Sequence, residues 1–126
     1  MDGMFFKCHA FDQPLANWNV SNVCSMESMF LGCTAFNQPL ETWNVSCVNN
    51  MEHMFYDCHA FNQPLANWNV TNVVHIYEMF QNCSAFNHNL FAWTLINERT
   101  KQVLLFSKAD QANHCLKEEP FAYLLK

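Results

Sequence analysis

A cysteine followed directly by a histidine is the feature of this sequence that could most readily perform chemistry. The pair occurs twice, in CHAFDQPLANWNV at residues 8–20 and in CHAFNQPLANWNV at residues 58–70. A nucleophilic cysteine needs a base within hydrogen-bond distance and an electropositive setting. Neighbours in an extended or turn segment tend to point in different directions, however. We therefore expect neither Cys8-His9 nor Cys58-His59 to be catalytic, and we expect no enzymatic activity.

The cysteine belongs to a longer pattern that recurs every 25 residues through four copies of the sequence. Histidine does not recur with it, because the intervening copies read Cys33-Thr34 and Cys83-Ser84. A strict period between roughly 20 and 50 residues with apolar columns is typical of a solenoid, in which each repeat packs only against its neighbours. We interpret two of the columns as structural ladders, formed by Cys8, Cys33, Cys58, Cys83, Trp18, Trp43, Trp68 and Trp93.

Two patterns within each repeat predict the elements that would position these columns. Residues 18–20 alternate apolar and polar side chains, which predicts a short strand with its apolar residues facing inward. Residues 26–33 place apolar side chains at i, i+3, i+4 and i+7, which predicts a short helix of about two turns. A proline follows the helical half and favours a turn there. The stacked strands would be parallel and about 4.8 Å apart.

The whole repeat resembles a known family. Residues 4–95 follow the pattern MF-x-x-C-x-AFNQPL-x-x-WNVSNV-x-x-M-x-x-MF, which is similar to the BspA-type, leucine-rich-repeat-like surface repeat of about 25 residues. That family occurs in bacterial surface lipoproteins, in protists and in large DNA viruses. The resemblance implies an α/β repeat solenoid of about four coils, each with a short parallel strand and a short helix. It also implies a role in adhesion or protein contact, without catalytic residues.

The chain is expected to have two parts. Residues 1–95 would form the solenoid, which starts in the middle of a repeat and so leaves its first coil open. Residues 96–126, where the columns fail and charge is concentrated, would form a C-terminal helical cap or docking tail. Solenoid ends expose core residues and usually need covering. The open coil would therefore meet a partner or another copy of the chain, or be weakly ordered.

Composition excludes several classes of protein. The 126 residues carry a formal net charge of −5, and residues 1–94 hold one basic residue against seven acidic ones. A nucleic-acid-binding protein needs a basic face, so we expect no nucleic-acid partner. Neither a signal peptide nor an apolar run long enough to cross a membrane is visible. We therefore expect no membrane insertion, a location inside the cell or within an assembled particle, and reduced cysteines.

Polar positions beside the tryptophan column are the candidates for partner contact. On the strand model they project away from the core, and their amides can hydrogen-bond along the stack. This candidate interaction face consists of Asn17, Asn19, Thr42, Asn44, Asn67 and Asn69. The sequence thus favours a non-enzymatic protein-interaction or structural module that contacts a protein through this face or through the open coil.

Two alternatives remain. The chain could be a self-assembling component of a larger structure, such as a virion or surface layer, in which neighbours cover the open coil. It could instead be a metal-binding or redox protein that uses the cysteine column. A tetrahedral zinc site needs four ligands that converge at about 2.3 Å, which a straight column cannot provide. We therefore expect no metal site and no cofactor.

Overall fold

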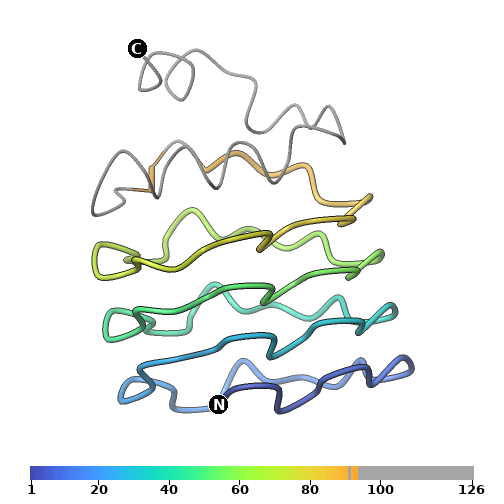
Figure 1. The fold of residues 1–126 in the computed structure, drawn as a ribbon, viewed down its shortest axis with the longest axis horizontal. Helices are drawn as coiled ribbons and strands as arrows, with labels where there is room; N and C mark the ends of the chain where they lie inside the picture. The colour runs from blue at the N-terminus through green and yellow to red at the C-terminus, as the bar shows by residue number, and fades with distance from the viewer. Residues whose placement is uncertain (91, 94–126) are drawn as a thin grey trace.

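Coils stacked one above another make up the protein. The computed structural model describes residues 1–90, 92 and 93, so the predicted cap at 96–126 lies outside the described residues. The N-terminal coil lies at one end of the stack, and each later coil follows the path of the one before it (Figure 1). Asn50, for example, forms parallel bridges with Ser25 in the preceding coil and His75 in the following one. The expected repeat architecture is therefore present.

The coils are built from turns. Within the described residues the structure contains no helix and no strand, only turns, irregular segments and the two isolated bridges. The prediction of a helix over 26–33 is wrong, because the segment forms successive turns closed by bonds from residue i to i−3. The amide of Met29 donates to the carbonyl of Met26 at 3.2 Å, and that of Cys33 to Phe30 at 2.9 Å. This part of the chain therefore also contains no helix that is long and apolar enough to cross a membrane.

Left-handed backbone angles explain why these turns do not continue as a helix. The φ angle is +55° at Ser28 and +76° at Gly32. A positive φ at the third residue is characteristic of a type II turn and lies outside the α-helical region. The same angle recurs at the equivalent positions of the other coils, namely Gly3, Lys7, His53, Asp57, Glu78 and Asn82.

Backbone pairing between coils occurs on these turns and not where the strand was predicted. We call residues 1–8, 26–33, 51–58 and 76–83 the turn stack. Alternate amides of one coil in the turn stack donate to carbonyls of the next at 2.7–3.0 Å, as from Phe30 to Met54. The predicted strand at 18–20 is absent, because its amides join no neighbouring coil: that of Trp18 closes a turn onto Leu15 in its own coil.

The core consists of files of aromatic rings that run along the stack. Phe30 stacks on Phe55 at 5.5 Å between ring centroids and on Phe36 of its own coil at 4.4 Å. These are favourable distances for offset stacking. Each fully buried phenylalanine contributes roughly 1.5–3 kcal/mol relative to an exposed one. The apolar columns that the sequence predicted as core are fully buried in the middle coils, including Met51, Met54, Phe61, Leu65, Val70 and Val73.

Candidate functional site

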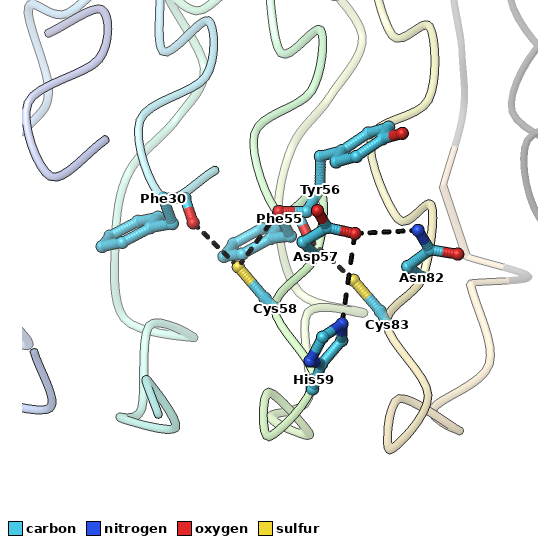
Figure 2. Close-up of polar contacts among 8 residues, drawn as sticks. All are labelled: Phe30, Phe55, Tyr56, Asp57, Cys58, His59, Asn82 and Cys83. Carbon is cyan, nitrogen blue, oxygen red and sulfur yellow. Dashed lines mark hydrogen bonds and ion pairs between the residues drawn. The ribbon is translucent and has the colours of Figure 1, made fainter. Parts of the chain in front are cut away.

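The cysteine column joins each coil to the one before it through side-chain hydrogen bonds. The Sγ atom of Cys58 donates to the carbonyl of Phe30 at 2.9 Å, and that of Cys83 donates to Phe55 at 2.8 Å (Figure 2). Cys33 makes the same bond to Phe5. These three cysteines are buried, whereas Cys8 in the first coil is exposed.

The tryptophan column makes an equivalent set of bonds. The Nε1 group of Trp68 donates to the carbonyl of Leu40 at 2.9 Å, and the same carbonyl accepts the backbone amide of Trp43 at 3.0 Å. One oxygen therefore closes a turn in its own coil and binds a side chain of the next. The pattern is repeated by Trp43 on Leu15 and by Trp93 on Leu65. Trp18, by contrast, is 39% exposed.

The Cys-His pair does not come together as a nucleophile and a base. Cys58 points into the core, whereas His59 lies on the surface with its Nε2 atom 4.0 Å from the Asp57 carboxylate (Figure 2). Burial, and then the neighbouring Cys83 thiol, raises the pKa of Cys58. Burial also raises the pKa of Cys33, from 9.0 to about 11. Both effects favour the neutral thiol, which is a poor nucleophile and a poor metal ligand.

The described residues contain no group of three or more His, Cys, Asp or Glu side chains that could hold a metal ion. Cys24 and Cys47, which lie outside the column, are exposed free thiols. The alternative of a metal-binding or redox protein thus finds no ligand set in this part of the chain.

All six residues of the candidate interaction face are exposed. Their amides do not form the ladder that the sequence suggested. Asn44 instead accepts two bonds on its Oδ1 atom from Ser46 of its own coil, from the backbone amide at 3.1 Å and from the hydroxyl at 2.6 Å. Asn19 with Ser21 and Asn69 with Thr71 repeat this local turn. Thr42 donates to the carbonyl of Ala16 in the preceding coil at 3.3 Å.

An amide ladder does exist, at the asparagine and glutamine of the FNQPL segment. The Oδ1 atom of Asn37 accepts the backbone amide of Asn62 at 2.9 Å and the Nε2 group of Gln63 at 3.0 Å, both from the next coil. Asp12 accepts the equivalent bonds from Asn37 and Gln38. An acceptor oxygen is all that these bonds require, so aspartate can take the place of asparagine in the otherwise identical first copy.

Sequence reasoning missed one surface cluster, formed by residues of two adjacent coils. The Nε2 atom of His53 lies 3.4 Å from the Glu78 carboxylate. The His53 ring is nearly perpendicular to those of Tyr56 and Tyr77, with ring centroids 5.6 and 5.8 Å away. A hydrogen bond to Glu78 raises the pKa of Tyr77, which is 51% exposed. These positions differ from coil to coil, and that departure from the repeat was the available signal.

A family model described as "Mycoplasma protein of unknown function, DUF285" matches residues 1–118. The match spans all four repeats and most of the chain. This chain belongs to the DUF285 family. No curated protein and no solved structure matches it.

Membership in the DUF285 family corrects the expected assignment in part. The family description carries no BspA or leucine-rich-repeat name, so the resemblance to those repeats remains a hypothesis. The description also assigns no activity.

Proposed function

We propose that this DUF285 chain is a non-enzymatic module that binds protein through the face formed by Asn17, Asn19, Thr42, Asn44, Asn67 and Asn69. Kinship with the BspA-type, leucine-rich-repeat-like repeats is part of the proposal. It is supported by the MF, AFNQPL and WNVSNV segments, although the coils lack the predicted helix and strand. Extended, regular surfaces of this kind are what repeat proteins use for binding.

The geometry of the asparagines is the observation that carries the proposal. In Asn19, Asn44 and Asn69 the Oδ1 atom is held by the hydroxyl two residues later at 2.6–2.7 Å. Among the described residues, no hydrogen bond uses the Nδ2 group of these side chains. Fixing one end of each amide orients the other end at low entropic cost on binding. The face thus offers a row of oriented donors, one per coil, to carbonyl or carboxylate groups of a partner.

A conservative double substitution tests this role. Asn44→Asp with Asn69→Asp keeps the acceptor oxygen that holds each turn but replaces the Nδ2 donor by a second oxygen. We expect the thermal unfolding midpoint to stay close to that of the wild type, while proteins captured by the intact wild-type chain in a pull-down are lost. Asn62→Asp is the matched control, since it makes the same change outside the face at a position where Asp12 already shows the aspartate to be accepted. Undiminished capture by the double variant would refute the proposal.

A second candidate is a structural component of a larger assembly, such as a virion or surface layer. It is supported by the first coil, where Met4 is 51% exposed and Trp18 39%, although later members of both columns are buried. Covering such residues favours association. Sedimentation analysis of the wild type and of Trp18→Arg distinguishes the cases. Self-association that the substitution removes supports assembly, and a concentration-independent monomer argues against it.

A further inference from the structure

The outward side chains of the turn stack do not follow the repeat. Four columns there lie between the core columns, and apart from the buried Gly32 their residues are exposed or half-buried. Each column contains residues of different chemistry: Asp2, Glu27, Glu52 and Tyr77; Gly3, Ser28, His53 and Glu78; Phe6, Leu31, Tyr56 and Gln81; Lys7, Gly32, Asp57 and Asn82. The backbone beneath them repeats regularly, because its amides bond from coil to coil. Packing of the repeat therefore fixes the position of these side chains but not their identity.

Negative charge accumulates on this edge. Five of the seven acidic residues in residues 1–94 lie on the turn stack, and the other two, Asp12 and Glu41, lie elsewhere on the coils. Asp2, Glu27 and Glu52 occupy the same position in three consecutive coils. Like charges directly opposite each other on neighbouring strands are destabilising. Asp2 and Glu27 each accept hydrogen bonds from the following coil. The Glu52 carboxylate makes no such bond among the described residues, so a cationic partner would relieve the repulsion at Glu52.

Exposed aromatic rings lie among these carboxylates. Tyr77 is 51% exposed and Phe6 is 47% exposed. The chain itself places an ammonium group against one of them, since the Nζ atom of Lys7 lies 5.2 Å from the centroid of the Phe6 ring. The half-buried Tyr56 and the exposed Tyr77 both lie against His53, whose Nε2 atom is 3.4 Å from the Glu78 carboxylate of the fourth coil. A ring face next to a carboxylate is a favourable site for a lysine or arginine side chain.

We propose that the outward edge of the turn stack is a docking surface for a lysine- and arginine-bearing segment of a partner protein. The partner's cations would lie over Tyr56 and Tyr77 and beside the carboxylates of Glu52, Asp57 and Glu78. This site goes beyond the proposed function, because it lies on turn residues distinct from the asparagine face and specifies the chemistry of the partner.

Labelled synthetic peptides provide the test. A peptide of alternating lysine and alanine should bind the intact chain in a fluorescence anisotropy titration, and a peptide of alternating glutamate and alanine should not. Raising the salt concentration should weaken binding, because exposed charges are screened. Tyr77→Ala should weaken it roughly two- to fivefold, the equivalent of the 0.5–1 kcal/mol of an exposed cation–π contact. Glu52→Lys should weaken it more, since it both removes an attraction and adds a repulsion.

Glu41→Lys is the matched control for Glu52→Lys. Both residues are acidic, both variants change the net charge equally, and neither carboxylate makes a hydrogen bond or ion pair among the described residues. Equal weakening by the two variants would mean that only net charge matters and would overturn the proposal. So would equal binding of the lysine and glutamate peptides, or no binding of either. Asn44→Asp with Asn69→Asp should leave peptide binding intact, so failure of this site and failure of the asparagine face are separable.

Discussion

Replacing Trp68 by phenylalanine tests whether side-chain bonds between coils stabilise the stack. Trp68 is 3% exposed, and its Nε1 group donates to the Leu40 carbonyl at 2.9 Å. That carbonyl keeps the amide of Trp43, so the substitution removes one of its two donors without leaving it unpaired. The lost bond should cost about 0.5–1.5 kcal/mol. The space left by the larger indole adds roughly 1–2 kcal/mol, less than the 3–5 kcal/mol typical of truncation to alanine.

The free energy of unfolding should therefore fall by about 1.5–3.5 kcal/mol. Urea unfolding, followed by the fluorescence of the remaining tryptophans, should show a lower midpoint with an unchanged m-value. Trp18→Phe is the internal control: it makes the same change in the same column, but Trp18 is 39% exposed, so its cost should stay below about 0.5 kcal/mol. Equal costs at the two positions would refute the idea that bonds between coils stabilise the column.

Three further substitution tests use the repeat as its own control. Gly32→Ala should lower the free energy of unfolding by about 1–2 kcal/mol, because φ is +76° and the new Cβ would lie 3.3 Å from the Lys7 Cα atom. Gly3→Ala, where the new Cβ has more room, should lower it less in the same urea titration. Asn37→Ala should cost about 1 kcal/mol by removing the acceptor for Asn62 and Gln63, whereas Asn37→Asp should be nearly neutral. Burial raises the pKa of Cys33 from 9.0 to about 11, so the folded chain keeps a proton that the unfolded chain releases, and stability should fall as pH rises through that window. Alanine at Cys33 should reduce this fall and alanine at the exposed Cys24 should not; an unchanged pH dependence in the Cys33 variant would contradict the assignment.

Core positions were predictable because the 25-residue period places equivalent apolar residues in one column, and this does not depend on the local backbone conformation. The columns that the sequence predicted as core are buried in the middle coils, whatever the local backbone. The helix over 26–33 was not excluded by the pattern, since successive turns bury residues 26, 29, 30 and 33 just as a helix would. Gly3 and Gly32 were the only glycines and both adopt positive φ. Gly32 aligns with Asp57 and Asn82, and Gly3 aligns with Ser28 and His53. These residue types indicated turns at both positions, but the helix-like spacing of the apolar residues obscured that signal.

The six residues of the candidate interaction face are exposed, but the hydrogen bonds that they make were not predictable from composition. An asparagine followed two residues later by serine or threonine can bond along the stack or within its own turn. The hydroxyls of Ser21, Ser46 and Thr71 donate to these asparagines and so favour the bond within the turn. The amide ladder formed instead at Asn37 and Asn62, where no hydroxyl competes. The edge cluster around His53 lay in columns that vary, which a search for repeating residues passes over.

Carbonyls shared between coils also determine how the protein should respond to force. Pulling on the two chain ends would load the outermost coil first, because every coil is held only by its neighbours. Each coil should detach from the next as the backbone and side-chain hydrogen bonds between them break one after another. One coil contains 25 residues, so a step would release roughly 90 Å of extended chain. We therefore expect the chain to unfold under load in steps of equal extension, one coil at a time.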